Sequence, residues 1–231
     1  MKTTLESIVS NIPFAATTMN RCSSLLTFRG SRKYWEDRYS SGRNSGPGSY
    51  GQLAEFKAEF INAFVKTHTV PSVIEFGSGD GNQLELAEYP QYTGLDVSRT
   101  AIEGCRQKFA DDCTKRFYLY DSTVFPDTQH LFRAQLALSL DVVYHLVEDH
   151  VFSNYMEHLF DAAERFVVVY SSNHDEVPVS PHMRHRRFSE WVTDYRPDWK
   201  LVERVPNRYP YDPKRPKETS LADFFVFEQD A

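Results

Sequence analysis

The sequence contains only three cysteines, Cys22, Cys105 and Cys113, and none of them forms a CxxC pair. An odd number of cysteines cannot all pair within one chain, and their spacing lacks the pattern of a structural zinc site. This cysteine usage is typical of a reduced, intracellular protein. We therefore expect neither a disulfide framework nor a bound metal ion.

Long apolar runs are also absent. No stretch approaches the roughly 20 apolar residues that a membrane-spanning helix needs. The opening segment MKTTLESIVSNIPF carries Glu6 and other polar side chains where a signal peptide would be apolar. The sequence therefore predicts a cytoplasmic protein without a membrane partner.

Basic residues are fewer than acidic ones. The 26 Lys and Arg against 32 Asp and Glu give a formal net charge of −6. Because nucleic-acid binding depends on neutralising phosphates with basic side chains, this balance argues against a nucleic-acid partner. The length of 231 residues and a hydrophobic content of 41% suit one large α/β domain, or such a domain with an added cap.

The composition of the chain changes near residue 51. The segment SSGRNSGPGSYG (40–51) is rich in Gly and Ser and predicts a loop, and an aromatic run precedes it at 34–39. We expect residues 1–51 to form an N-terminal helical cap and lid, and residues 52–231 to form the main domain. Apolar residues near the start of the cap have helical spacing: Leu5, Ile8, Val9 and Ile12.

Strand and helix patterns alternate after the loop. Alternating β and α units with buried strands imply a parallel sheet covered by helices on both faces. The last two strands, joined by a long non-helical connection, predict an antiparallel hairpin at one edge. The predicted strands cover 72–76, 92–97, 116–121, 134–140, 165–172, 199–205 and 224–229. The predicted helices cover 53–68, 82–89, 98–109, 148–164 and 188–195.

The strongest chemical signal is VIEFGSGDGNQL, in which a strand runs directly into a glycine-rich loop. Glycine permits a tight turn and lets the backbone approach a bound ligand. Acidic residues end the next two predicted strands. Asp96 in LDVS can accept hydrogen bonds from both hydroxyls of a ribose, and Asp121 in YDST can accept one from an adenine amino group. The GxGxG spacing differs from the GxGxxG of nicotinamide cofactor sites, which disfavours a dehydrogenase.

At these residues the sequence resembles the class I S-adenosylmethionine-dependent methyltransferases. EFGSGDG is similar to the first motif of that family, Asp96 to its ribose-binding acid, Asp121 to its adenine-side acid and LALSLDVVYHLVED (136–149) to its fourth motif. The resemblance covers about residues 52–231. It implies an α/β, Rossmann-like fold with a seven-stranded, mostly parallel sheet, an antiparallel last strand and helices on both faces. It also implies S-adenosyl-L-methionine as cofactor and S-adenosyl-L-homocysteine as product. The residues expected to bind the cofactor are Glu75, Gly77, Gly79, Gly81, Asp96, Asp121 and Leu140.

Methyl transfer requires a positioned acceptor and, for a hydroxyl or amine, removal of its proton. His145, four residues after Asp141 in the fourth motif, is the candidate general base by placement, because an imidazole titrates near neutral pH. Its alternative role is to cap the following helix or to pack beneath it. Tyr144 beside it can line the methyl pocket. Five aromatic residues can form a cage around the sulfonium through cation–π contacts: Tyr34, Trp35, Tyr50, Tyr144 and Tyr170.

Two irregular segments are expected to contact the acceptor, which we take to be a small molecule. The first is the lid, where Ser45, Gly46 and Ser49 accompany Asn44 and Tyr50 and can close over the sulfonium, or form an ordinary surface loop. The second is the insertion after the fifth strand, where His182, Arg184 and His185 can bind a carboxylate or phosphate, or simply occupy a loop. The predicted substrate-binding residues are Tyr34, Trp35, Asn44, Tyr50, Tyr170, Asn173 and His174.

Four functions fit these patterns. The first is a methyltransferase that acts on an oxygen or nitrogen of a small molecule or sugar. The second is a cyclase that folds the amino-acid tail of the cofactor back on itself. This closes the four-membered ring of azetidine-2-carboxylate and releases methylthioadenosine. The third is a non-catalytic S-adenosylmethionine-binding domain, and the fourth is a nicotinamide oxidoreductase. The products distinguish the first two, since methyl transfer releases S-adenosylhomocysteine and cyclisation releases methylthioadenosine.

Overall fold

The structure is a computed structural model that describes residues 28–125, 127–175 and 180–230. The predicted helical pattern between Leu5 and Ile12 lies outside these residues. All seven predicted strands are present, each with ends within two residues of those expected. They are β1 (Val73–Phe76), β2 (Tyr92–Asp96), β3 (Lys115–Leu119), β4 (Ala134–Leu140), β5 (Ala163–Ser171), β6 (Trp199–Val205) and β7 (Asp223–Gln229).

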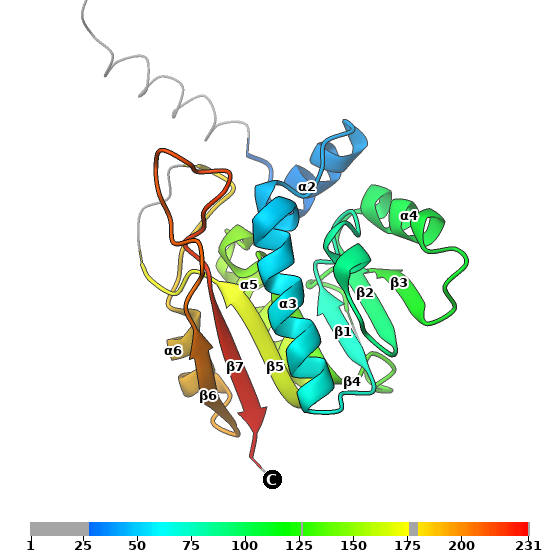
Figure 1. The fold of residues 1–231 in the computed structure, drawn as a ribbon, viewed down its shortest axis with the longest axis vertical. Helices are drawn as coiled ribbons and strands as arrows, with labels where there is room; N and C mark the ends of the chain where they lie inside the picture. Colours follow the sequence, from blue (N-terminus) through cyan, green and yellow to red (C-terminus); the bar gives the residue numbers. More distant parts are fainter. Residues whose placement is uncertain (1–27, 126, 176–179, 231) are drawn as a thin grey trace, which may run out of the picture.

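The seven strands form one sheet in the order β3-β2-β1-β4-β5-β7-β6. Each neighbouring pair from β3 to β5 is parallel, whereas β7 runs antiparallel to both β5 and β6. The predicted reversed last strand and the predicted hairpin at the sheet edge are therefore confirmed. The carboxyl ends of the parallel strands share one edge of the sheet, at the top in Figure 1.

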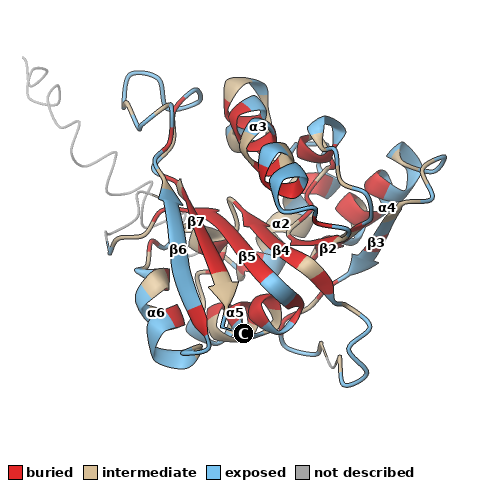
Figure 2. Ribbon diagram, turned by 60° about the horizontal axis from the view of Figure 1, so that its bottom comes forward, coloured by how far each residue is buried: buried red, intermediate tan, exposed pale blue. Residues whose placement is uncertain are grey.

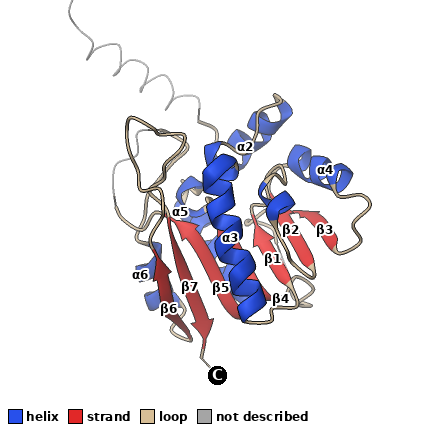
Figure 3. Cartoon of the chain, in the orientation of Figure 1, coloured by secondary structure: helices blue, strands red, loops and turns tan. Residues whose placement is uncertain are grey.

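Helices cover both faces of the sheet, as predicted (Figure 3). On one face, Phe56, Ile61 and Phe64 of one helix pack against residues of the sheet. On the other face, Phe152 and Met156 do the same. The helices are α2 (Ser31–Ser40), α3 (Gly51–Thr67), α4 (Arg99–Lys108), α5 (Asp149–Asp161) and α6 (Phe188–Tyr195). None of the helices in the described part of the chain is long and apolar enough to cross a membrane.

Burial across the sheet follows the sequence pattern. Residues 166–171 of β5 are all buried, because neighbouring strands and helices cover the strand on every side. In contrast, β6 forms an edge and exposes residues 200–204 (Figure 2). Lys200, Glu203 and Arg204 supply charges there, which discourage pairing with another chain.

The helix predicted over 82–89 is wrong. The structure has a single 3₁₀ turn, Gln83–Leu86, in that place. The side chain of Asn62 on α3 explains the difference. Its amide donates to the Leu86 carbonyl oxygen (2.9 Å) and its carbonyl oxygen accepts from the Glu88 N–H (3.0 Å). Both backbone groups are thereby satisfied outside a helix, so the chain turns toward β2 without completing one.

The aromatic run of the cap forms α2, which lies beyond the carboxyl edge of the sheet (Figure 1). Polar side chains fasten α2 to three other elements. Ser31 Oγ donates to Glu148 Oε2 (2.6 Å), and Arg32 Nη1 lies 2.5 Å from Asp121 Oδ2. Glu36 Oε1 accepts from Thr100 Oγ1 at the start of α4 (2.6 Å). The helix α2 therefore covers the carboxyl edge of the sheet, where the glycine-rich loop lies.

Candidate active site

The glycine-rich loop begins at the end of β1. Gly77 and Gly79 have φ angles of 92° and 57°, a region that favours glycine. The Gly79 N–H donates to Asp96 Oδ2 (2.9 Å), and a Cβ added at Gly79 would lie 2.5 Å from Ser45 Oγ. The loop backbone is therefore held closely between the end of β2 and the segment 44–50, and a side chain at position 79 would not fit.

Asp96 ends β2 and is fixed by the backbone. Its second carboxylate oxygen, Oδ1, accepts from the Ser98 N–H (2.8 Å). Burial raises the pKa of Asp96 to about 6, with the two backbone hydrogen bonds acting in the opposite direction. At neutral pH the carboxylate is ionised and rigidly oriented, and its remaining lone pairs can accept from the hydroxyls of a ribose.

A cavity of about 540 Å³ opens above the loop. Small-molecule sites typically have volumes of about 300–1,000 Å³, so this space can hold a nucleoside-type cofactor. Gly81 does not line it. Asp121 does, although it lies two residues past the end of β3 rather than within the strand. We call this space the cofactor cavity after the ligand that the sequence predicts for it. The predicted cofactor residues that line it are Glu75, Gly77, Gly79, Asp96, Asp121 and Leu140.

Glu75 contributes a buried acid to the floor of the cofactor cavity. Its Oε2 accepts from the Tyr92 hydroxyl (2.6 Å). Burial raises the pKa of Glu75 to about 7, while this hydrogen bond and the positive charge of Lys57 act to lower it. The carboxyl group of Glu75 is therefore close to half-protonated at neutral pH.

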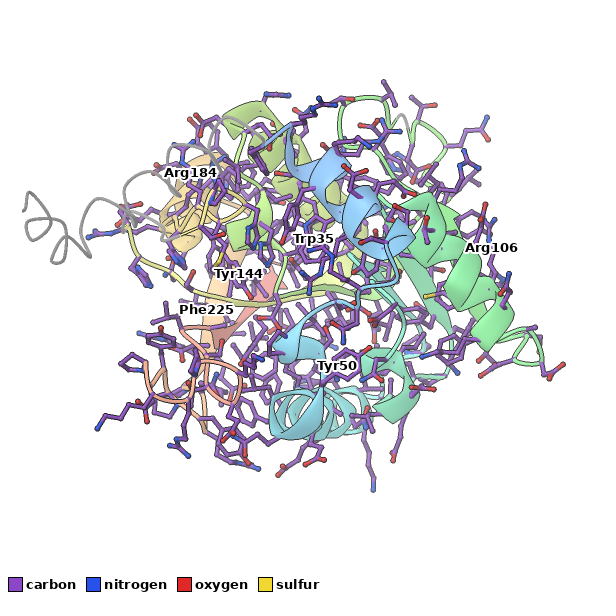
Figure 4. The ribbon with its side chains drawn as sticks, turned by 90° about the horizontal axis from the view of Figure 1, so that it is seen from above. Trp35, Tyr50, Arg106, Tyr144, Arg184 and Phe225 are labelled. Atoms are coloured by element: carbon purple, nitrogen blue, oxygen red, sulfur yellow. The ribbon has the colours of Figure 1, made fainter. Side chains whose placement is uncertain are left out.

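A second cavity, of about 300 Å³, adjoins the first. Five residues line both cavities and so form the boundary between them: Trp35, Ser45, Ser49, Asp141 and His145. The walls of this second cavity come from α2, the end of β4, the insertion at 182–185 and the long β6–β7 connection. In Figure 4, which looks down on this end of the sheet, Trp35 lies near the middle and Tyr144 lies to its left in this view.

His145 lies at the boundary between the cavities, and its surroundings determine which ring nitrogen carries a hydrogen. Its Nδ1 is 3.0 Å from the backbone carbonyl oxygen of His182, which can only accept, so Nδ1 carries the hydrogen. Burial lowers the pKa of His145 to about 4. The imidazole is therefore neutral at neutral pH, and its Nε2 is an unprotonated acceptor. Trp35 meets this ring edge-on, with centroids 4.9 Å apart.

Several aromatic residues of the predicted cage do not reach the cofactor cavity. Trp35 lines it, whereas Tyr34 and Tyr144 line only the second cavity. Tyr50 and Tyr170 line neither. The Tyr170 ring packs against Phe224 in the core, with centroids 4.7 Å apart, because its position on β5 directs it toward the α3 face.

The predicted polar substrate residues are also spread more widely than expected. Asn173 Nδ2 donates to Ser189 Oγ (2.7 Å) beside α6, and the His174 ring stacks on His185 at 4.8 Å. Neither Asn173 nor His174 lines either of these two cavities. Of the insertion residues, His182 and His185 line the second cavity, whereas Arg184 is paired with an acid of α5.

Asp80, an acid that sequence reasoning missed, holds the predicted lid segment 44–50 against the glycine-rich loop. Asp80 Oδ2 accepts from the Ser45 N–H and from the Tyr50 hydroxyl, both at 2.8 Å. Asn44 lines neither cavity, but its carbonyl oxygen accepts from Arg38 Nε (2.6 Å). Asp80 lies between Gly79 and Gly81 in the loop motif, and this position could have identified it as a site residue.

Lys57 is a second residue that sequence reasoning missed. It lines the cofactor cavity, and its Nζ contacts Asp141 Oδ2. Lys57 lies four residues after Leu53 and four before Ile61, so it shares the apolar face of α3. A lysine on such a face is unusual, because buried lysines require a partner, and this position could have identified it.

The sequence matches no protein-family model and no curated protein, but solved structures share the fold. N-methyltransferase NodS from Bradyrhizobium japonicum WM9, in complex with S-adenosyl-L-homocysteine, aligns with a TM-score of 0.65 at 14% identity, covering 87% of this chain and all of that one (100%). Magnesium protoporphyrin IX methyltransferase (ChlM) from Synechocystis PCC 6803, with bound S-adenosylmethionine, gives 0.61 at 14% identity, covering 88% and 99%. The methyltransferase domain of bacterial CtHen1-C gives 0.59 at 19% identity, covering 76% and 97%. With its strand order, its glycine-rich loop and this likeness, the chain has the Rossmann-like fold of the class I S-adenosylmethionine-dependent methyltransferases.

Proposed function

We propose that the protein is an S-adenosylmethionine-dependent methyltransferase that methylates an oxygen or nitrogen of a small molecule or sugar. The observation that carries this proposal is the pair of adjoining cavities, which share five lining residues, among them Trp35, Asp141 and His145. One cavity suits a nucleoside-type cofactor, and the other suits a second reactant. Methyl transfer needs both spaces in contact, because the donor and the acceptor must approach each other closely.

The cofactor cavity offers contacts for each part of S-adenosylmethionine. Asp96 would accept from the ribose hydroxyls through its remaining lone pairs. Asp121, whose oxygens also accept from Arg32 and Thr123, would accept from the adenine amino group. The glycine-rich loop brings its backbone to the cavity wall without side chains at Gly77 and Gly79. When bound, S-adenosylmethionine supplies an electrophilic methyl group on a sulfonium.

The residues at the boundary have distinct tasks in this proposal. Neutral His145 accepts the proton of an acceptor hydroxyl or amine at Nε2, while the His182 carbonyl holds Nδ1–H in place. Asp141 accepts from the Tyr144 hydroxyl (2.8 Å) and from Lys57, which fixes its carboxylate beside the acceptor. Trp35 presents its ring to both cavities and shields the boundary from water.

The second cavity also favours methyl transfer over cyclisation of the cofactor. Cyclisation uses the amino group of the cofactor itself and needs no space for another reactant. The cavity of about 300 Å³ beside His145 would then have no task. A cofactor-binding domain without catalysis would likewise leave the proton acceptor at His145 unexplained.

Two measurements test the proposal. The first is calorimetric titration with S-adenosylhomocysteine, which we expect to bind to the wild-type chain. Asp96→Asn should weaken that binding by at least about tenfold, because an amide cannot accept from both backbone N–H groups and from a ribose at once. Asp111→Asn, an exposed acid that lines neither cavity, is the matched control and should bind as the wild type does.

The second measurement is mass spectrometry of nucleosides released from S-adenosylmethionine, with and without a pool of sugars and small metabolites. Acceptor-dependent S-adenosylhomocysteine supports the proposal. Steady release of methylthioadenosine without an acceptor would instead establish the cyclase. Binding of S-adenosylhomocysteine without any turnover across the pool would favour the non-catalytic domain.

A further inference from the structure

The second cavity has an uneven charge. Of the described residues that line it, only Arg38 and Asp141 carry a formal charge. Asp141 is neutralised by Lys57, whose Nζ lies 2.6 Å away. Arg38 has no such partner, since no ion pair within the described ranges involves it. The cavity therefore presents the charge of one guanidinium.

Two of the three histidines that line the second cavity, His145 and His182, do not alter this balance. Burial lowers the pKa of His182 and of His145 to about 4, and the positive charge of Arg38 acts in the same direction on both. At neutral pH the two imidazoles are polar but uncharged. A ligand in this cavity therefore meets the positive charge of Arg38 and no uncompensated negative charge.

Arg38 is held so that its charge faces the cavity. Its Nε donates to the Asn44 carbonyl oxygen (2.6 Å), and its guanidinium carbon lies 5.7 Å from the centroid of the Trp35 ring. This arrangement uses Nε and leaves the two terminal nitrogens of the guanidinium as donors. Two parallel N–H groups match the two oxygens of a carboxylate.

Part of the second cavity is lined by flat rings. Tyr34 and His182 are stacked with centroids 4.3 Å apart and an interplanar angle of 10°, and His145 continues the stack at 5.5 Å and 12°. Because His182 lies between the other two rings, the stack offers ring edges, which favour edge contact with a planar ring. The volume of about 300 Å³ lies at the lower end of small-molecule sites and so restricts the ligand to a small one.

We propose that the methyl acceptor is a small ring-bearing carboxylic acid, whose carboxylate pairs with Arg38 and whose ring lies against the wall formed by Tyr34 and His182. This inference rests on the proposed methyltransferase function. A single cation matches a singly charged carboxylate better than a doubly charged phosphate. The same placement brings a hydroxyl or amine on the ring toward His145, which lines both cavities.

The test compares acids with their uncharged amides. The probes are 4-hydroxybenzoate, anthranilate and indole-3-acetate, each beside its primary amide, titrated into the full chain saturated with S-adenosylhomocysteine. We expect at least one acid to bind at least about tenfold more tightly than its amide. Arg38→Met should abolish that preference, and Arg38→Lys, which keeps the charge without the fork, should retain part of it. Arg43→Met, an exposed arginine that lines neither cavity, is the matched control and should keep it fully.

The outcomes separate this inference from the proposed function. Equal binding of acids and amides, no binding by any of the three acids, or an unchanged preference in Arg38→Met would overturn the inference. Binding of S-adenosylhomocysteine in those same experiments would leave the methyltransferase proposal standing. Failure of S-adenosylhomocysteine to bind the wild-type chain would overturn both proposals.

Discussion

Lys57 Nζ donates to Asp141 Oδ2 across 2.6 Å, although the two residues lie 84 positions apart in the sequence. The lysine side chain is only 1% exposed and that of Asp141 13%. Asp141 also has a left-handed φ of 61°, which is uncommon outside glycine. The ion pair joins α3 to the end of β4 and holds a strained residue at the boundary between the two cavities. Strain of this kind is typical of functional sites.

Removing only one member of this pair is expected to destabilise the protein. Lys57→Met leaves the Asp141 carboxylate without its cation in a largely buried position, which costs about 3 kcal/mol of unfolding free energy. Urea unfolding followed by circular dichroism measures this change. The double variant Lys57→Met/Asp141→Asn should recover part of the loss, because it buries no uncompensated charge.

Lys66→Met is the matched control, since Lys66 is an exposed lysine on the same helix. Its unfolding free energy should stay within about 0.5 kcal/mol of the wild type. Equal stability of the single variant Lys57→Met and the double variant would mean that the buried charge of Asp141 is not the cause.

A side chain at Gly79 is expected to displace the lid. In Gly79→Ala the new methyl group would lie 2.5 Å from Ser45 Oγ and 3.1 Å from the Tyr39 hydroxyl. The segment 44–50 must then move away from the loop, and S-adenosylhomocysteine should bind at least about tenfold more weakly in a calorimetric titration.

Gly51→Ala controls for backbone strain in this comparison. Gly51 has nearly the same φ (54° against 57°), but nothing lies within 4 Å of the position of its Cβ. Both variants carry the cost of an alanine in a left-handed conformation, about 1 kcal/mol. Only Gly79→Ala should lose affinity for S-adenosylhomocysteine, and equal losses would mean that the contact with Ser45 is unimportant.

The stability of the protein is expected to depend on pH through Glu75. Burial raises its folded pKa to about 7, whereas its ordinary value is 4.5. Between these values the folded state binds more protons than the unfolded state, so the unfolding free energy falls as pH rises through this window. Glu75→Gln does not titrate and should lack this decrease.

Urea unfolding at a series of pH values measures the effect. Relative to Glu75→Gln, the wild type should lose up to about 3 kcal/mol between about pH 5 and pH 8. Glu88 is an exposed glutamate in the segment that precedes β2, and Glu88→Gln should retain the pH dependence of the wild type. A constant difference between the wild type and Glu75→Gln would contradict the raised pKa of Glu75.

Local patterns in the sequence predict much of this fold. The strands 134–140 and 199–205 and the helix 188–195 occur with the predicted ends, because their apolar spacing is set by their own residues. The glycine-rich loop and the acid Asp96 could likewise be assigned to the cofactor cavity, since parallel strands bring their carboxyl ends to one edge.

The acceptor side could not be predicted in the same way. The second cavity forms where α2, the insertion at 182–185 and the β6–β7 connection meet, and none of these contacts is visible as a periodic pattern. The wrong helix at 82–89 has a similar cause, because Asn62 on a distant helix satisfies its backbone groups. Contacts between residues far apart in the sequence decide both features, and a single sequence does not record them.

The protonation state of the His145 ring tests the proposed proton acceptor directly. A neutral ring with hydrogen on Nδ1 and none on Nε2 should be visible in long-range ¹H–¹⁵N NMR spectra, with the resonances assigned from their absence in His145→Gln. Because burial lowers its pKa to about 4, these resonances should not titrate between about pH 8 and pH 5.

In urea-unfolded protein His145 should titrate at about pH 6.5. Protonation favours the unfolded state in this window, so stability from the neutral ring is present above about pH 6.5 and is lost as pH falls toward the folded pKa. A ring that titrates near about pH 6.5 in the folded protein would contradict the lowered pKa of His145. A ring with hydrogen on Nε2 would remove His145 as the proton acceptor and direct the search to Asp141, which lies at the same boundary.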